Sequence, residues 1–342
     1  MENIDSIWDQ YIKINMLGTS EYGTVYKAKS KKDNTIVSIK EYLTYQKDAI
    51  QIYKNEIKYL EELKSNNIIN YIKKIEIKEN YYIIRNYYSG TLEDFIKVHQ
   101  KKISLKEIQL ILLDLCKAFK ILNDKNLIHS NIKPSNILLS LNGKNGYKSI
   151  LSGIYLIKKY TEINNFSLRG IRNICPPEGL KRESINMKYD IWSVGILIYY
   201  MIEGKYPFEG STDMVILKKI EKGINLNISS DYDLNDLIKK CLEKNVNLRI
   251  SWKDFFNHPF FTKNIEENNG NGNEDTNKIR NVLNEKKKEY QGVIKKYVNE
   301  IKNYSTMIKK YQPDYLNKFD SNIKDKLIEI AKLFDELYKS NF

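Results

Sequence analysis

The chain has 342 residues, 42% of them hydrophobic, which is enough for one large domain with its own core and an appendage. Its net charge is +13, but the basic residues are spread along a chain rich in Asn, Ile and Tyr, which indicates an AT-rich coding sequence rather than a specific nucleic-acid site. Three cysteines without CxxC spacing argue against a disulfide scaffold, and the acidic N-terminus argues against a signal peptide. The longest apolar run, Ile191–Ile202, is too short to span a membrane. We therefore expect a soluble, cytoplasmic or otherwise intracellular protein.

Residues 11–29 alternate apolar and polar side chains around a turn that contains Gly18, Ser20 and Gly23. The pattern predicts a β-hairpin. Glycines in such a turn let backbone N–H groups approach a phosphate, whereas Ser20 narrows the approach.

The next apolar run, residues 36–41, predicts a buried strand that carries Lys40. Residues 49–64 then predict a helix. This helix carries three glutamates, Glu56, Glu61 and Glu62.

Residues 104–123 have apolar side chains near helical spacing and predict an amphipathic helix. It leads into residues 128–139, IHSNIKPSNILL, where two apolar runs flank a polar loop. The polar positions of the loop are candidates for chemistry, namely His129, Asn131, Lys133 and Asn136.

Residues 147–156 end near Gly153 and contain no acid. No aspartate occurs between Asp124 and Asp190, and the acids in that interval are Glu162, Glu178 and Glu183. This part of the chain therefore cannot provide an aspartate for catalysis or metal binding.

The C-terminal part has a different pattern. Residues 264–277 are polar and of low complexity, which is typical of a flexible linker. Beyond them, apolar residues from Tyr290 to Tyr311 alternate spacings of four and three, Pro313 interrupts the pattern, and a second amphipathic stretch covers 315–338. We expect a helical hairpin or coiled-coil segment over 278–342, which either packs on the preceding domain or mediates self-association.

Taken in order, these motifs resemble those of the eukaryotic serine/threonine protein kinase family over residues 11–261. The resemblance implies an α+β fold of two lobes, a small β-rich lobe at about 11–86 and a large, mainly helical lobe at about 87–261. Residues 1–10 are then an N-terminal extension, 262–277 the linker, and 278–342 the helical segment.

The resemblance also assigns nucleotide-binding roles in the small lobe. Lys40 matches the phosphate-contacting lysine and Glu56 its helix partner, with Glu61 and Glu62 as nearby alternatives. Arg85 falls at the gatekeeper position, where a buried guanidinium needs a partner. It could turn outward, contact an acid or phosphate, or partly fill the adenine pocket. The full set implied to bind nucleotide is Leu17, Gly18, Gly23, Val25, Lys40, Glu56 and Arg85.

In the large lobe the resemblance is incomplete at the catalytic positions. Lys133 and Asn136 match the family, but Asn131 replaces the aspartate that accepts the proton of the attacking hydroxyl. Leu151 replaces the aspartate that binds Mg²⁺ and has no oxygen to offer. The residues that match the structural part of the pattern are His129, Glu178, Asp190 and Arg249.

These substitutions lead to three hypotheses. The first is a pseudokinase that acts as a scaffold or allosteric regulator of protein partners, such as an active kinase, with weak ATP binding that does not depend on Mg²⁺. The second is an atypical active serine/threonine kinase that borrows an acid, for which Glu162 is the candidate. The third is an interaction protein driven by residues 278–342, with no role for nucleotide.

Overall fold

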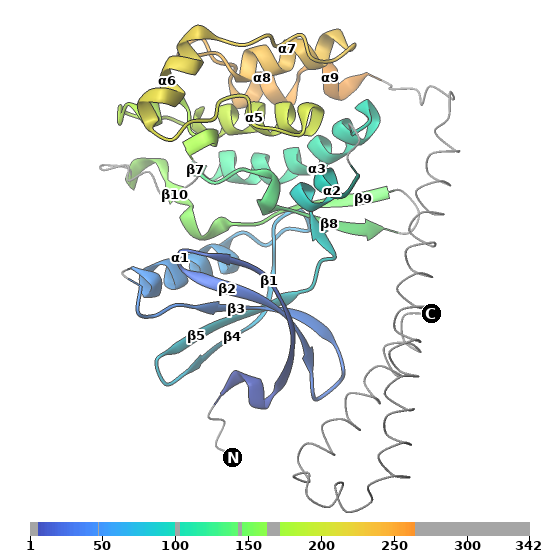
Figure 1. Cartoon of the computed structure of the whole chain (residues 1–342), viewed down its shortest axis with the longest axis vertical. Coiled ribbons are helices and arrows are strands. Elements are labelled where there is room, and N and C mark those ends of the chain that lie inside the picture. The colour runs from blue at the N-terminus through green and yellow to red at the C-terminus, as the bar shows by residue number, and fades with distance from the viewer. Residues whose placement is uncertain (1–5, 47, 100–102, 143–145, 163–171, 264–342) are drawn as a thin grey trace, which may run out of the picture. The chain divides into compact units, whose positions relative to one another are not determined.

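A computed structural model of the chain describes residues 6–46, 48–99, 103–142, 146–162 and 172–263 (Figure 1). The chain divides into two units, Met1–Ile265 and Glu266–Phe342, and the described residues belong to the first. The hairpin expected over 278–342, and nearly all of the linker before it, lie outside the described residues.

The small lobe is a five-stranded antiparallel sheet, within the described residues, with strand order β1-β2-β3-β5-β4. The hairpin expected over 11–29 is confirmed by the pairing of β1 with β2. The strands are β1 Tyr11–Ser20, β2 Gly23–Ser30, β3 Ile36–Tyr42, β4 Tyr71–Ile77 and β5 Asn80–Asn86, with helix α1 Ala49–Glu62 between β3 and β4.

One face of β3 packs into a core and the other carries polar residues of the site, because successive side chains of a strand point to opposite faces. Val37 and Ile39 belong to a small core on one face, together with Ile7 and Ile84. Lys40 and Tyr42 alternate with them. Both contact Glu56 of α1, so this face of the strand carries the polar site.

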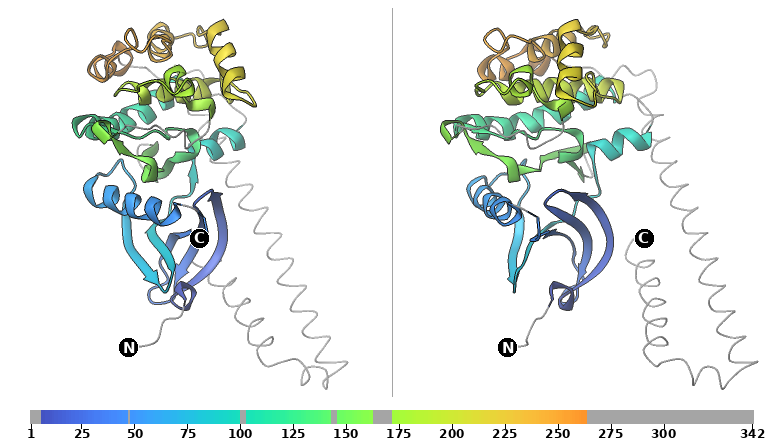
Figure 2. Two further views of the ribbon diagram at one scale, coloured as in Figure 1. Left: turned by 90° about the vertical axis from the view of Figure 1, so that its left-hand side faces the viewer. Right: turned by 60° about the vertical axis from the view of Figure 1, so that its left-hand side comes forward.

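Helix α1 has one buried side, formed by residues such as Ile52, Ile57 and Leu60. It lies at the end of the sheet nearest the helical lobe (Figure 2). Asn55 on this helix donates from Nδ2 to the carbonyl oxygens of Tyr155 and Ile157, at 2.8 and 3.1 Å. The helix therefore joins the small lobe to the segment that follows strand β9, Gly146–Leu151.

The large lobe is mainly helical (Figure 1). Its long helix begins after Ser104, whose hydroxyl accepts a hydrogen bond from the Glu107 backbone N–H while the Glu107 carboxylate accepts from the Ser104 N–H, a capping box. The helices are α2 Leu92–His99, α3 Leu105–Asp124, α4 Pro177–Leu180, α5 Tyr189–Glu203, α6 Asp213–Lys222, α7 Tyr232–Cys241, α8 Trp252–Phe256 and α9 Pro259–Thr262, and the short strands are β6 Gly90–Thr91, β7 Leu127–Ile128, β8 Ile137–Asn142, β9 Gly146–Leu151 and β10 Lys158–Lys159.

Helix α5 is the centre of this lobe, with every residue from Tyr189 to Ile202 buried. A helix that is apolar all round needs neighbours on all sides. Within the described part of the chain, no helix is both long and apolar enough to cross a membrane. The α+β fold of two lobes expected from the sequence is confirmed.

Candidate functional site

The first part of the site is a buried charge cluster around Glu56. Lys40 Nζ on β3 donates to Glu56 Oε2 at 2.7 Å. The hydroxyl of Tyr42 donates to the same oxygen, and Arg85 on β5 donates to Oε1. All four side chains are buried, and Glu56 is fully enclosed.

The charges of this cluster do not balance, because two cations share one carboxylate. Burial by itself would raise the pKa of Glu56, but the positive charges of Arg85 and Lys40 lower it to about 2. Burial lowers the pKa of Lys40, and the charge of Arg85 adds to this effect while Glu56 opposes it. The carboxylate is thus firmly ionised, and the excess positive charge is shared by its two partners.

Of the alternatives for Arg85, the structure shows contact with an acid, Glu56, and excludes an outward orientation, since the side chain is buried. Among the described residues its Nε finds no hydrogen-bond partner. The competing candidates for the partner of Lys40 lie elsewhere, since Glu61 pairs with Lys74 and Glu62 with Lys125.

The turn between β1 and β2 forms the next part of the site. Ser20 Oγ donates to the carbonyl oxygen of Gly23 at 3.0 Å and closes the turn. A Cβ on Gly23 would lie 2.5 Å from the carbonyl oxygen of Glu41, so only glycine fits there, whereas Gly18 has open space around it. Leu17 is exposed beside Gly18, and Val25 on β2 lies opposite Gly18 on one side and Lys40 on the other.

The polar loop before β8 is held by Asp190 at the start of α5. Its two carboxylate oxygens accept the backbone N–H groups of His129 and Ser130, at 2.6 and 2.9 Å. The His129 ring is fully buried, and burial lowers its pKa to about 4. Its Nε2 lies 3.1 Å from the carbonyl oxygen of Ser152, which a neutral ring can satisfy by donating.

The loop brings Asn131, Lys133 and Asn136 together around the short turn Pro134–Asn136. Asn136 Nδ2 donates to the backbone oxygen of Asn131 at 2.8 Å, and Asn131 Nδ2 donates to the hydroxyl of Tyr155 at 3.2 Å. Lys133 is partly buried, and burial lowers its pKa while the charge of Glu93 opposes the shift. The group at the position of the base is therefore an amide that acts as a donor.

Leu151, at the position of the metal ligand, is fully buried in the main core. Its backbone N–H donates to Asn67 and its carbonyl oxygen accepts from Ile69, both at 2.9 Å. This residue therefore joins the end of β9 to the segment between α1 and β4. Gly153 follows with φ 78°, and a Cβ there would meet the Asn136 side chain at 2.5 Å.

These residues do not form a set of donors suited to Mg²⁺, which prefers carboxylate and phosphate oxygens. The Asn136 side chain can offer one neutral amide oxygen, since its Nδ2 donates to Asn131, and Leu151 offers only methyl groups. Among the described residues, no group of three or more His, Cys, Asp or Glu side chains could hold a metal ion. The carboxylate of Glu162, the acid considered for an atypical kinase, lies outside the described part of the chain.

Two tyrosines of the site were not among the residues singled out from the sequence. Tyr42 could have been found, because it is two residues beyond Lys40 and therefore on the same face of β3. Tyr155 carries no such signal. It lies two residues after Gly153, and only the folded structure brings it to Lys40 and Asn131.

The clamp of the large lobe joins Glu178 to Arg249. The guanidinium donates from both terminal nitrogens to the two carboxylate oxygens, at 2.7 and 2.9 Å, and the arginine is 1% exposed. Arg249 also donates to the backbone oxygens of Glu243 and Lys188. A bidentate pair with its remaining donors satisfied fixes the position of α4, which carries Glu178.

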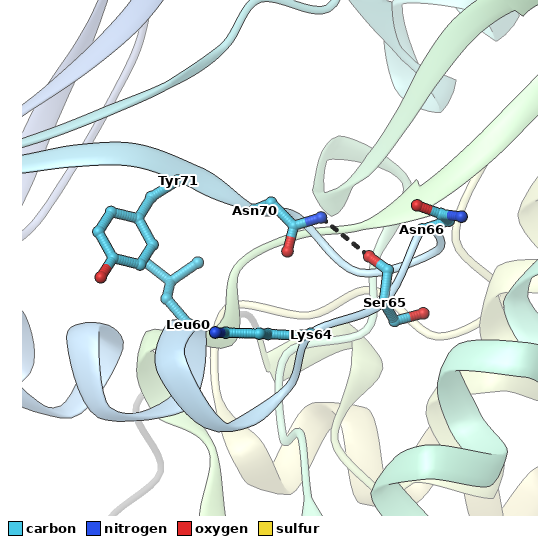
Figure 3. A pocket seen from close by; sticks show the side chains of 6 residues that line it. All are labelled: Leu60, Lys64, Ser65, Asn66, Asn70 and Tyr71. Atoms are coloured by element: carbon cyan, nitrogen blue, oxygen red, sulfur yellow. Dashed lines mark hydrogen bonds between the residues drawn. The ribbon is translucent and has the colours of Figure 1, made fainter.

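A separate hollow of about 480 Å³ lies beyond the C-terminal end of α1 (Figure 3). It is lined by Leu60, Lys64 and Tyr71, among others, and by Asn70, whose Nδ2 donates to the Ser65 carbonyl oxygen at 3.0 Å. None of its lining residues belongs to the cluster around Glu56.

Comparisons with known proteins agree with this arrangement. The family model described as protein kinase domain matches residues 11–261. Serine/threonine-protein kinase pakG of Dictyostelium discoideum is 30% identical over 262 residues, which are 73% of this chain and 21% of that protein. Serine/threonine-protein kinase ULK3 of Mus musculus is 30% identical over 261 residues, which are 74% of this chain and 55% of the mouse protein. Serine/threonine-protein kinase ATG1c of Arabidopsis thaliana is 26% identical over 260 residues.

The chain thus spans between about a fifth and just over half of the length of these relatives. Within the matched region it contains the β-rich small lobe, the paired Lys40 and Glu56, the loop held by Asp190, and the clamp between Glu178 and Arg249. The family uses ATP, typically with Mg²⁺. On the family match and the identity to these kinases, the chain is a member of the protein kinase family.

Proposed function

We propose that this protein is a pseudokinase, which binds ATP weakly and without need of Mg²⁺ and acts through protein partners rather than by phosphoryl transfer. The observation that carries the proposal is the chemistry at two positions. The amide of Asn131 stands where a substrate hydroxyl would be deprotonated, and buried Leu151 stands where Mg²⁺ would be held. An amide is too weak a base for that step, and loss of acid–base help costs a factor of about 10²–10⁴ in rate.

The rest of the site supports nucleotide binding without a metal. Lys40 and Arg85 carry two positive charges against the one negative charge of Glu56. A triphosphate is an anion, so an excess cation near its phosphates replaces part of the attraction that Mg²⁺ would supply. The buried contacts of Glu56, Asp190 and Glu178 maintain the kinase fold of both lobes. A maintained fold suits a protein that acts by binding protein partners.

One observation favours a second candidate, an atypical active serine/threonine kinase. The ion pair between Lys40 and Glu56 is formed, as active kinases require. The relatives are also named as serine/threonine kinases. An active kinase needs an acidic side chain to bind the metal. The described residues at the two catalytic positions, Asn131 and Leu151, are not acidic.

The test is an assay of phosphate transfer from γ-labelled ATP, together with a thermal-shift titration with ATP. We expect the unmodified chain to transfer no more phosphate than the Lys40→Met variant does. We expect ATP to raise the melting temperature equally with Mg²⁺ and with EDTA, because a ligand that binds only the folded state stabilises it. Transfer that Lys40→Met abolishes would support the active kinase. A melting temperature unchanged by millimolar ATP in both buffers would contradict the nucleotide-binding part.

A further inference from the structure

Tyr155 lies where the two halves of the site meet. Its ring centroid is 4.3 Å from Lys40 Nζ, the nitrogen that the family places at the phosphates. Its hydroxyl accepts a hydrogen bond from Asn131 Nδ2 at 3.2 Å. One side chain therefore contacts both the phosphate-binding lysine and the residue at the position of the catalytic base.

The ring is held from two further directions. Tyr22, at the turn between β1 and β2, packs edge-on against it with ring centroids 6.4 Å apart. The backbone of the short turn Ile154–Leu156 is fastened to α1 by Asn55, whose Nδ2 donates to the Tyr155 carbonyl oxygen at 2.8 Å. Tyr155 is thus positioned by the glycine-bearing turn, by α1 and by the polar loop together.

These contacts enclose the ammonium group of Lys40. It is bound to Glu56 Oε2 and lies over the rings of both Tyr42 and Tyr155, and only 4% of the residue is exposed. A phosphate needs a free direction of approach to this nitrogen. Glu56 and Tyr42 are fully buried, whereas Tyr155 is only partly buried, so the ring of Tyr155 is the partner that can move away.

We propose that Tyr155 is an internal gate that closes the phosphate-binding end of the site, and that ATP binds only when the ring leaves Lys40. The proposal rests on the ATP binding proposed above and adds its regulation. An anionic phosphate then competes with the aromatic face for the same cation. The measured affinity for ATP is reduced by the fraction of molecules in which the gate is closed.

The first experiment compares the affinities of ATP and adenosine for the full chain and for Tyr155→Ala, Tyr155→Phe and Tyr160→Ala. We expect Tyr155→Ala to bind ATP about tenfold more tightly and adenosine with little change, because only the phosphates compete with the ring. Tyr155→Phe keeps the ring and should behave as the unmodified chain does. Tyr160, which is exposed in the same segment, provides the matched control. Equal ATP affinity in Tyr155→Ala and the unmodified chain would overturn the gate.

The second readout needs no nucleotide. Acetic anhydride modifies accessible amines, and mass spectrometry measures the modified fraction of Lys40. We expect Lys40 to be protected in the unmodified chain and in Tyr155→Phe, and to be modified at least several-fold faster in Tyr155→Ala. Asn55→Ala removes the hydrogen bond to the Tyr155 backbone but keeps the ring, so Lys40 should be modified at an intermediate rate. This variant replaces Tyr155→Ala in the test if Tyr155→Ala fails to fold.

The two readouts separate the gate from the proposed ATP binding. Faster modification of Lys40 without ATP binding in any variant would support the gate and contradict the nucleotide proposal. Equal modification in Tyr155→Ala, Asn55→Ala and the unmodified chain would overturn the gate whatever the ATP result.

Discussion

Each lobe contains a buried group of paired charges, and the two groups are built differently. In the large lobe, Arg249 and Glu178 form a neutral pair, both carboxylate oxygens are bound by the guanidinium, and the other donors of the arginine reach backbone oxygens. In the small lobe, Glu56 serves two cations and a tyrosine hydroxyl, and Arg85 Nε finds no partner among the described residues.

The difference indicates what each pair is for. A buried charge is tolerated when its partner neutralises it and every polar atom is satisfied, and the large-lobe clamp meets both conditions. The small-lobe cluster meets neither, since it retains an excess positive charge at the place where the family binds phosphates. The clamp therefore serves the fold, whereas the cluster suits a site that receives an anion.

The largest effect is expected from breaking the neutral pair. Arg249→Leu leaves Glu178 buried without a partner and should lower the free energy of unfolding by about 3–5 kcal/mol. Urea unfolding measures the change. Arg172→Leu is the control, because the Arg172 side chain is 57% exposed and that of its partner Asp213 is 30% exposed, so this pair should contribute less than about 1 kcal/mol. Similar losses in the two variants would show that burial of the clamp is unimportant.

A smaller loss of stability is expected when the pH is lowered, because Glu56 becomes protonated. Its pKa is lowered from 4.5 to about 2 in the folded chain, so its contribution is complete above about pH 4.5 and is lost as the pH falls toward 2. The loss amounts to about 3 kcal/mol at 1.36 kcal/mol for each pKa unit. In Arg85→Leu the pKa of Glu56 should be closer to 4.5. This variant should therefore lose less stability than the unmodified chain between pH 5 and 3 in urea unfolding.

The same variant gives the smallest effect at neutral pH. Arg85→Leu removes the second cation and the unpartnered Nε, and an apolar residue suits the buried strand β5. We expect the free energy of unfolding to change by less than about 1 kcal/mol at pH 7, in contrast to Arg249→Leu. A loss of 3 kcal/mol or more would mean that both pairs are structural clamps of the same kind.

Several features of the site were predictable from the sequence because they depend on local pattern. An apolar run placed Lys40 on a buried strand, and the helix expected over residues 49–64 placed Glu56 on α1. The resemblance to the kinase family marked Glu178 and Arg249 as structural residues, and the structure shows that they form an ion pair. Contacts between residues distant in sequence were not predictable in the same way. Leu151, seen only as a lost metal ligand, also joins β9 to Asn67 and Ile69.

The sequence by itself determined the family, the two lobes and the residue types at the catalytic positions, because motif order and hydrophobic period are properties of the chain. Only the tertiary structure decided that Arg85 turns to Glu56 and that the ring of Tyr155 covers Lys40. The physical reason is that a side chain's partner depends on which groups the packed elements bring within a few ångströms, and neither spacing nor residue type records that.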